Sequence, residues 1–428
     1  MSSSIKNNPA TDQQKATVTV PLVDILHEAE SGLLALSIHT GLRVLQELMD
    51  AEVDQLAGIK GRHNPDRQAV RHGTEQGFVY RGDRKIPLTH PRVRTQDSAE
   101  ELPLATYHAF QDPTQATQTV LERMLFGLAS RQQVHADAAF ESAVETAGPS
   151  KSTVSRRFIQ ATQQALDQFL RRRIDDQTWV VLMIDGIRVG GHLVVVALGI
   201  DATGHKRILG MSEGATENTT VVKHLLTDLV DRGLAFPGGG LAVIDGAKAL
   251  AKGLHEVFGS ALRIQRCQIH KQRNVLDEVA ESAKHNVQLA LRKAYQEPEA
   301  PKALAALEKL AQELAHDYPS AAASLREGLA ETLTVHQLGL SGTLRQSLAN
   351  TNVLESVNSQ YRALAKNVKH WSNGVQVLRW LAAASFFIED RLTRIPGYRD
   401  LPQLQQALHP TVPPEQARVH AGESSASG

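Results

Sequence analysis

The chain has 428 residues, 42% of them hydrophobic and 4% aromatic, so we expect roughly two to four domains with helix-rich cores of Leu, Val and Ala. Its 46 basic residues balance its 46 acidic residues, which argues against a wholly basic packaging protein but allows local basic patches. Cys267 is the only cysteine, and neither an apolar run of about 18 residues nor a secretion signal occurs, so we expect a cytoplasmic protein without disulfides or membrane contact.

The first 95 residues divide into a polar tail and a segment that is helical and then basic. Residues 1–17 are polar and are expected to be a disordered tail. The second segment, residues 18–95, opens with apolar residues that recur at helical spacing between positions 22 and 56. This spacing predicts amphipathic helices ahead of the basic stretch.

The basic stretch, residues 58–94, holds nine Lys or Arg against three Asp or Glu. Within it, residues 78–80 and 85–88 have the pattern of a short β-hairpin. Phosphate binding depends on such local clusters of basic side chains. Three basic residues at the hairpin are therefore candidate DNA contacts: Arg81, Arg84 and Lys85. A solvated charged face is the alternative interpretation.

Residues 96–175 are predicted to form a helix-turn-helix DNA-binding region. Residues 137–159 indicate a helix, a turn at 147–149 and a second helix that Ser150 or Ser152 can cap. A helix that opens with Ser, Lys, Thr and Arg suits the major groove of DNA, whereas an ordinary capped helix pair is the alternative. The candidate DNA contacts are Lys151, Ser152, Thr153, Ser155, Arg156 and Arg157.

Residue usage changes over 176–272, the predicted first part of an α/β catalytic core. Five apolar runs have the composition of strands, and helical patterns separate the last three of them. The predicted strands are 179–184, 193–200, 207–211, 241–244 and 262–266, and the predicted helices are 217–230 and 247–257. This order, β-β-β-α-β-α-β, predicts a mixed five-stranded sheet covered by helices, preceded by a mostly α-helical DNA-binding region.

The remaining residues are predicted to be helical up to a C-terminal tail. Residues 273–345 have the pattern of a helical insertion, and residues 346–395 that of the C-terminal helices of the core. Trp371 and Trp380 lie in these helices, where anchoring the core is favoured over stacking on DNA bases. Residues 396–428 are rich in Gln, Pro, Ser and Gly, which predicts a loose tail.

Two aspartates end apolar strands in the same local sequence, Ile-Asp-Gly. Asp185 follows the first predicted strand, and Asp245 follows the fourth. One aspartate at a strand end is commonly a turn former, but carboxylates at adjacent strand ends can converge on one edge of a sheet. Oxygen ligands placed in this way suit Mg²⁺ or Mn²⁺. A bound cation would also offset the repulsion between the two carboxylates.

A third carboxylate is expected, because phosphoryl-transfer sites with two metal ions about 3.5–4 Å apart usually need one. Glu355 lies at the start of a predicted helix, after Asn350 or Asn352, and Arg362 follows two turns later on the same face. Glu355 is therefore a candidate metal ligand, and Arg362 is a candidate phosphate contact. Stabilisation of the helix dipole is the alternative role for Glu355.

Together these residues resemble the bacterial insertion-sequence transposases of the Mutator type, in the D-D-E superfamily. The resemblance covers roughly residues 30–395 and depends on motifs that occur in the expected order. They are Asp185, Asp245, Arg266-Cys267-Gln268-Ile269-His270 and Asn352-Val353-Leu354-Glu355-Ser356. Residues 77–94, the helix-turn-helix, Arg362 as the basic residue after the glutamate, and the C-terminal helices add weaker support.

The resemblance implies a ribonuclease-H-like catalytic core in which Asp185, Asp245 and Glu355 hold two Mg²⁺ or Mn²⁺ ions. It implies a transposase that cuts double-stranded DNA at the terminal inverted repeats of an element and joins the freed ends to target DNA. It further implies a homodimer or larger homo-oligomer that works at the bacterial nucleoid. Two alternatives stay open: a structure-selective nuclease of the same fold, and a non-catalytic, transposase-derived DNA-binding regulator.

Cys267 and His270 form a Cys-x-x-His pair that has three possible roles. The spacing is that of half a zinc site, but no second cysteine exists to complete it. The resemblance implies a motif near the active site, with His270 as a candidate catalytic residue that orients a phosphate or a water. In the third interpretation His270 is an interior histidine and Cys267 a small core thiol.

Overall fold

The computed structural model describes residues 33–127, 150–216 and 218–409, except positions 63, 66, 82, 83, 98 and 99. The tail expected at 1–17, the first helix and the turn of the expected helix-turn-helix, and everything after residue 409 lie outside the described residues. The chain divides into two compact units, residues 1–161 and 162–428, and each is described by itself.

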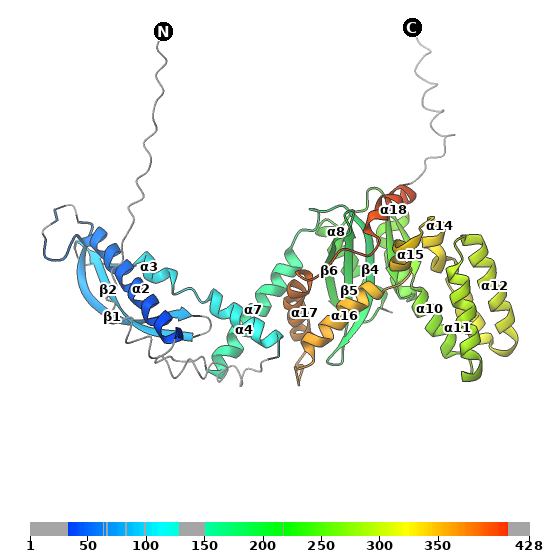
Figure 1. Cartoon of the computed structure of the whole chain (residues 1–428), viewed down its shortest axis with the longest axis horizontal. Coiled ribbons are helices and arrows are strands. Elements are labelled where there is room, and N and C mark those ends of the chain that lie inside the picture. The colour runs from blue at the N-terminus through cyan, green and yellow to red at the C-terminus, as the bar shows by residue number, and fades with distance from the viewer. Residues whose placement is uncertain are drawn as a thin grey trace, which may run out of the picture. The chain divides into compact units, whose positions relative to one another are not determined.

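The first unit combines helices with a three-stranded antiparallel sheet in the order β1-β2-β3. Its elements are α2 (Leu33–Ala57), β1 (Ala69–Arg81), β2 (Arg84–Thr95), β3 (Glu101–Leu102), α3 (Ala105–Ala109) and α4 (Thr114–Leu125) (Figure 1). The expected hairpin is confirmed but is much longer than residues 78–88, since β1 has 13 residues. Met49 and Val53 of α2 are fully buried against the sheet, where they form a core with Val79, Ile86 and Val93.

The second unit contains a mixed five-stranded sheet in the order β6-β5-β4-β7-β8 (Figure 1). Its elements are β4 (Trp179–Val189), β5 (His192–Asp201), β6 (Lys206–Glu213), α8 (Thr219–Asp231), β7 (Gly240–Ile244), α9 (Lys248–Phe258) and β8 (Leu262–Arg266). The predicted order of strands and helices is confirmed. Strands β4, β5 and β6 pair antiparallel, whereas β4, β7 and β8 pair parallel.

Helices cover both faces of this sheet, as its composition requires. Every residue of β7 is buried, which is typical of a parallel strand packed on two sides. Helices α8 and α9 pack on one face, in a core that includes Leu182 and Ile184 of β4. Helices α16 (Asn352–Ala365) and α17 (Gly374–Glu389) contact β4 and β6.

Helices follow β8 as far as residue 348, and many of them share a hydrophobic core that includes Leu291, Leu307 and Leu325. The elements of this predicted insertion are α10 (Gln268–Asp277), α11 (Glu281–Gln296), α12 (Ala300–Asp317), α13 (Pro319–Arg326), the 3-10 helix η2 (Ala330–Leu333), α14 (Thr334–Gln337) and α15 (Gly342–Leu348). In Figure 1 it is the yellow-green group of helices beside the sheet. Contacts of η2 and α14 with β8 join it to the edge of the sheet.

The C-terminal tail differs from expectation. The sequence predicts a loose tail from residue 396, but a 3-10 helix η3 (Tyr398–Asp400) and the helix α18 (Leu401–Leu408) form there. Leu401, Leu404 and Leu408 are buried, and α18 contacts β7. Apolar residues at helical spacing thus stabilise a helix within a segment whose average composition is polar.

The boundary between the units falls inside helix α7 (Lys151–Arg171), and not at residues 175–176 as predicted. The part of α7 after Ala161 belongs to the second unit, where Phe169 is fully buried. Arg172, just after the helix, forms an ion pair with Glu389 of α17. None of the helices in the described residues is both long and apolar enough to cross a membrane.

Candidate active site

Asp185 lies in β4 and faces the side of the sheet that α16 covers. Leu182 and Ile184 pack towards α8 and α9, and side chains alternate along a strand, so Asp185 points to the opposite face. The side chain of Asn358, on α16, donates a hydrogen bond to Oδ2 of Asp185 over 3.1 Å. Oδ1 accepts from the backbone N–H of Gly186 over 2.9 Å. Asp185 is 8% exposed, so both bonds are shielded from water.

Asp245 directly follows the neighbouring parallel strand β7, where the pairing of β7 with β4 ends. Ile184 of β4 pairs with Ile244 of β7, so Asp185 and Asp245 directly follow paired residues. Asp245 is half-buried, and its Oδ1 accepts a hydrogen bond from the backbone N–H of Ala247 over 2.9 Å. The turn from Asp245 to Ala247 passes through Gly246, whose φ of 110° would be strained for any residue other than glycine.

Glu355 lies in the first turn of α16 and is connected to the Cys-x-x-His pair. Thr351 donates a hydrogen bond to Oε1 of Glu355 over 3.3 Å, and Nε2 of His270 lies 3.9 Å from the same oxygen. The Thr351 hydroxyl also lies 3.4 Å from Nδ1 of His270 and 3.5 Å from Sγ of Cys267. The pair is therefore next to the glutamate, and Cys267, which is fully buried, caps the helix that carries His270.

Like charges and burial perturb the ionisation of these groups. Burial, followed by repulsion from Asp245, raises the pKa of Asp185 to about 6. A hydrogen bond with Cys267, and then the charges of Cys267, Asp185 and Glu355, raise the pKa of His270. Burial opposes ionisation of Cys267, but hydrogen bonds from His270 and Thr351 outweigh it and lower the pKa of the thiol. Negative charge is therefore concentrated at this edge of the sheet and is only partly offset by His270.

The donor atoms suit a hard divalent cation, although the side chains do not form a closed ligand set. In the part of the chain that the structure describes, no group of three His, Cys, Asp or Glu side chains is close enough to hold a metal ion. The charges of both Asp245 and Glu355 nevertheless raise the pKa of Asp185, so all three carboxylates act on one small region. Oxygen donors and unbalanced negative charge are what Mg²⁺ or Mn²⁺ requires.

Asn358 is a site residue for which the sequence pattern suggested no role. It is 1% exposed and donates to Asp185, while its Oδ1 is buried without a hydrogen-bond partner among the described residues. Its position three residues after Glu355, on the same helix face, was the available signal. Arg362, one turn further along α16, is exposed, so the structure brings Asp185, Asp245, Glu355 and His270 together but leaves Arg362 in solvent.

The start of α7 presents most of the expected DNA-contacting residues to solvent. The backbone N–H of Thr153 bonds to Oγ of Ser150 over 3.2 Å, so Ser150 caps the helix. Thr153 and Arg157 are half-buried, and the Arg157 guanidinium lies 5.2 Å from the Tyr80 ring of β1. The exposed members of the set are Lys151, Ser152, Ser155 and Arg156.

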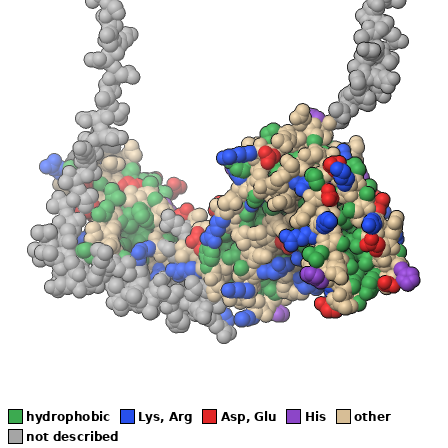
Figure 2. Space-filling model, turned by 45° about the vertical axis from the view of Figure 1, so that its right-hand side comes forward, with side chains coloured by type: hydrophobic (Ala, Val, Ile, Leu, Met, Phe, Trp, Pro, Cys, Tyr) green, Lys and Arg blue, Asp and Glu red, His purple; other side chains and the backbone are tan. Residues whose placement is uncertain are grey.

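The basic residues of the hairpin differ in exposure. Arg81 is exposed, and Nζ of Lys85 lies 3.6 Å above the ring of Phe78. Arg84 is only 2% exposed, which contradicts its expected role as a phosphate contact, because its guanidinium is packed within the unit. On the second unit, Figure 2 shows basic side chains spread over the visible face with acidic ones between them.

Of the two tryptophans expected to anchor the core, Trp380 is buried and Trp371 is half-buried beside it. The ring of Trp380 meets that of Trp371 edge to face at 5.7 Å between centroids. Trp371 also packs against Gly190 in the turn between β4 and β5, where a Cβ atom would clash with the indole. Neither ring is presented as an open stacking platform.

Comparison with known sequences identifies the family of the chain. The model of the family described as "Transposase, Mutator family" matches residues 13–391. The transposase for insertion sequence element ISRM5 of Rhizobium meliloti is 25% identical over 92% of this chain and 97% of its own length. The transposase for IS6120 of Mycolicibacterium smegmatis is 31% identical over 52% and 69%, and that for IS1081 of Mycobacterium tuberculosis is 24% identical over 85% and 86%. The chain belongs to the Mutator family of transposases.

Proposed function

We propose that this chain is a DNA transposase whose catalytic carboxylates are Asp185, Asp245 and Glu355, on a ribonuclease-H-like sheet. The observation that supports the proposal is that the charges of Asp245 and Glu355 both act on Asp185. Asp185 and Asp245 follow paired residues of adjacent parallel strands, and the helix of Glu355 is bonded to Asp185 through Asn358. The relatives, named as transposases for insertion sequence elements, support the same activity.

The three carboxylates would hold two Mg²⁺ or Mn²⁺ ions. The raised pKa of Asp185 supports this, because it comes from burial and then from repulsion by Asp245, and a bound cation would offset both costs of the charged carboxylate. Bound cations supply Lewis acidity, which activates the attacking oxygen and stabilises the leaving oxygen of a phosphodiester. Among the chain's own residues, Asn358 orients Asp185, and His270 with Thr351 restrains Glu355.

The reaction would proceed by two phosphoryl transfers at one site. In the first, water attacks a phosphodiester at the element end, and the bond from phosphorus to the 3′ oxygen breaks, which leaves a 3′-hydroxyl. In the second, that hydroxyl loses its proton and attacks a phosphodiester of target DNA, whose own 3′ oxygen leaves. Arg362, exposed on the helix of Glu355, would contact a phosphate of either substrate.

The first unit would supply recognition of the terminal inverted repeats. The exposed residues at the start of α7 would read the major groove, and Arg81 and Lys85 of the hairpin would contact phosphates. Because two element ends must be joined in one event, the active assembly would be a homodimer or a larger homo-oligomer. Its place of action would be the nucleoid of a bacterial cell.

The proposal is tested with Asp185→Asn, Asp245→Asn and Glu355→Gln in the full chain. Each should abolish Mg²⁺-dependent cleavage of terminal-repeat DNA while leaving binding to that DNA unchanged. Asp231→Asn, an exposed carboxylate at the end of α8, is the matched control and should cleave normally. If all three variants still cleave, these carboxylates are not the catalytic ones.

A second experiment supplies pre-cut element ends and a plasmid target. Joined products support a transposase. Cleavage without joining would instead indicate a nuclease of the same fold, and DNA binding without any Mg²⁺-dependent covalent product would indicate a regulator.

A further inference from the structure

Arg266 connects the turn that carries Asp245 to the helical insertion. It is the last residue of β8 and is 7% exposed. Its Nη1 donates to the carbonyl oxygen of Gly246, the residue after Asp245, over 2.9 Å. The same nitrogen lies 3.3 Å from Oε1 of Glu327, and its Nε forms an ion pair with Glu331. One guanidinium thus contacts the aspartate turn on one side and two insertion carboxylates on the other.

The insertion residues around Glu327, which bind the Arg266 side chain, are themselves fixed in place. Nζ of Lys271, which is buried, donates to the carbonyl oxygens of Ser324 and Glu327 over 2.6 and 2.7 Å. Gly328 has a φ of 60°, and a Cβ there would lie 2.5 Å from Nε of Arg266, so only glycine leaves room for the guanidinium. The insertion residues beside Arg266 therefore have little freedom to move independently of it.

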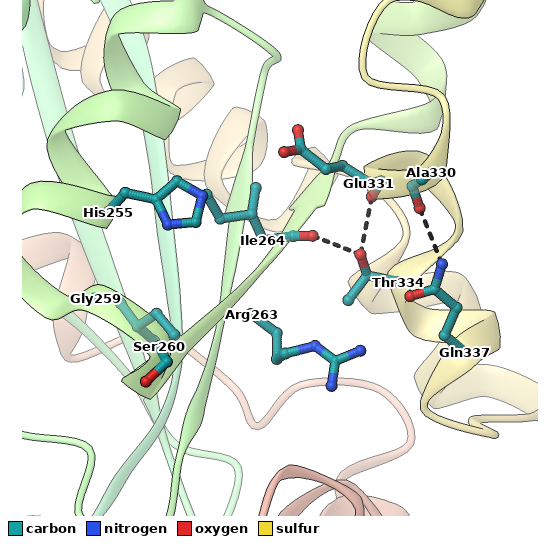
Figure 3. A pocket seen from close by; sticks show the side chains of 10 residues that line it. His255, Gly259, Ser260, Arg263, Ile264, Ala330, Glu331, Thr334 and Gln337 are labelled. Atoms are coloured by element: carbon teal, nitrogen blue, oxygen red, sulfur yellow. Dashed lines mark hydrogen bonds between the residues drawn. The ribbon is translucent and has the colours of Figure 1, made fainter.

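Glu331 is also held against strand β8 through the backbone of its own helical turn. Figure 3 shows the hydroxyl of Thr334 between two carbonyl oxygens, that of Ile264 in β8 and that of Glu331. These hydrogen bonds are 2.5 and 3.2 Å long. In the same view the Glu331 carboxylate points away from Thr334. The position of η2 on β8 therefore determines where the Glu331 carboxylate meets Arg266.

Arg266 contributes directly to the geometry of the turn at Asp245. Gly246 adopts a backbone conformation with positive φ there, and the backbone N–H of Ala247 donates to the Asp245 carboxylate. The carbonyl of Gly246 is held by Arg266, whose planar guanidinium can bind the carbonyl and the carboxylates at the same time. Loss of that contact would let the Asp245 side chain move relative to Asp185.

We propose that Arg266 is a positioning residue for Asp245 and that Glu331 of the insertion sets its orientation. The insertion thereby controls how tightly the carboxylate site binds divalent cations. The inference depends on the proposed function, since it assigns Asp245 to a cation site. It predicts that a change at Glu331, a residue of the insertion that is bonded to Arg266 and through it to the Asp245 turn, alters that site.

The experiment measures Mn²⁺ binding by the full chain with electron paramagnetic resonance, which needs no catalysis. Glu331→Gln removes the charge of a side chain that is 34% exposed, and Glu308→Gln, exposed on α12, is the matched control. Glu331→Gln should weaken Mn²⁺ binding on the order of tenfold, the usual effect of a residue that orients a ligand. Arg266→Lys should act in the same direction, while terminal-repeat DNA binding and the melting temperature of Glu331→Gln stay close to wild type.

A double variant separates positioning from general loosening of the fold. If Glu331 acts through Asp245, then Glu331→Gln should have no further effect on Mn²⁺ binding in an Asp245→Asn background. Wild-type affinity in Glu331→Gln, with affinity lost in Asp245→Asn, would overturn the inference and leave the proposed function intact. Wild-type affinity in Asp245→Asn would instead overturn the proposed site. Should Arg266→Lys fail to fold, Glu331→Gln alone decides the question.

Discussion

The carboxyl group of Asp185 is buried, and its surroundings disfavour the ionised form. It lies on the sheet face beneath α16, beside Asp245, and its pKa is raised to about 6 from 3.8. Well below pH 3.8 the group is protonated in both the folded and unfolded states, so it adds no ionisation cost to folding. Between pH 4 and 6 the unfolded chain releases this proton more readily, so stability falls as the pH rises. Above pH 6 the full destabilisation is present.

Replacing this carboxyl should therefore stabilise the metal-free protein. At pH 7.5 in EDTA, Asp185→Asn should raise the free energy of unfolding of the second unit on the order of 1–3 kcal/mol and flatten its dependence on pH between 4 and 6. Mg²⁺ should raise the melting temperature of the wild type but not of the variant. Thermal melts at several pH values measure both effects, and Asp231→Asn is the exposed control. A variant that is less stable than wild type at pH 7.5 would contradict the assigned cause.

Asn358 offers a second test at the scale of a single residue. Asn358→Ala leaves Oδ2 of Asp185 without its donor, and Asn358→Asp adds a further carboxylate next to it. We expect cleavage to fall roughly 10–100-fold in Asn358→Ala, as for other residues that orient a ligand, and further in Asn358→Asp. Single-turnover cleavage measures this, with terminal-repeat DNA binding as the check on folding. Gln360→Ala, on the opposite side of α16, should cleave at the wild-type rate.

At the scale of elements, the edge strand β6 is secured by charged groups from three helices. Glu389 of α17 accepts from Arg172 and from the backbone N–H of Ile208, over 2.6 and 2.8 Å. Arg232, at the end of α8, donates to the carbonyls of Leu209 and Phe169 over 2.6 and 3.2 Å. These contacts satisfy backbone groups on an edge that would otherwise be open to pairing with another chain.

Glu389→Ala should therefore be strongly destabilising. It leaves Arg172 and the N–H of Ile208 without their acceptor in a nearly buried setting, which costs about 3–5 kcal/mol. Glu389→Gln keeps one oxygen acceptor and should cost less. Urea unfolding of the full chain, followed through the tryptophans of the second unit, measures the difference, and Glu308→Gln is the control. Equal stability of Glu389→Ala and wild type would show that the ion pair is not coupled to the sheet edge.

The elements that could be predicted are those whose signal is local. The apolar, β-branched runs before Asp185 and Asp245 predicted both strands, because side-chain periodicity depends only on neighbours in sequence. The predicted end of the first strand was wrong, since β4 continues past Asp185 to Val189 in its pairing with β5. Helix α18 was missed because its three buried leucines lie in a Gln-rich segment whose composition dominated the interpretation. The burial of Arg84 was also missed, since charge indicates an exposed face on average and only packing reveals the exception.

Contacts between segments far apart in the chain could not be predicted from the sequence. The 20 residues that separate Arg266 from Gly246, and the 65 that separate it from Glu331, carry no pattern that predicts a shared hydrogen-bond network. The same holds for Asn358 and Asp185, 173 residues apart. The sequence therefore suggested candidate carboxylates, and only the fold shows which side chains contact them.

At the scale of the whole molecule, the formal net charge is zero, with 46 basic and 46 acidic residues. A protein with this balance gains little from long-range attraction to DNA, so its affinity must come from a few well-placed cations. The exposed start of α7 offers two such cations, Lys151 and Arg156, at a capped helix end. Binding should therefore depend on salt through a small number of phosphate contacts.

This dependence gives a quantitative test of recognition. Lys151→Ala and Arg156→Ala should each reduce the slope of log affinity against log salt by about 1, because each removes one phosphate contact. Lys309→Ala, exposed on α12, should leave the slope unchanged. Arg84→Ala should lower the stability of the first unit and not the slope, because its guanidinium is packed inside the unit. Fluorescence anisotropy with terminal-repeat DNA between 50 and 200 mM KCl measures all four. If both α7 variants keep the wild-type slope, this helix does not supply the phosphate contacts. If Arg84→Ala folds and has a reduced slope, the hairpin opens when it binds DNA.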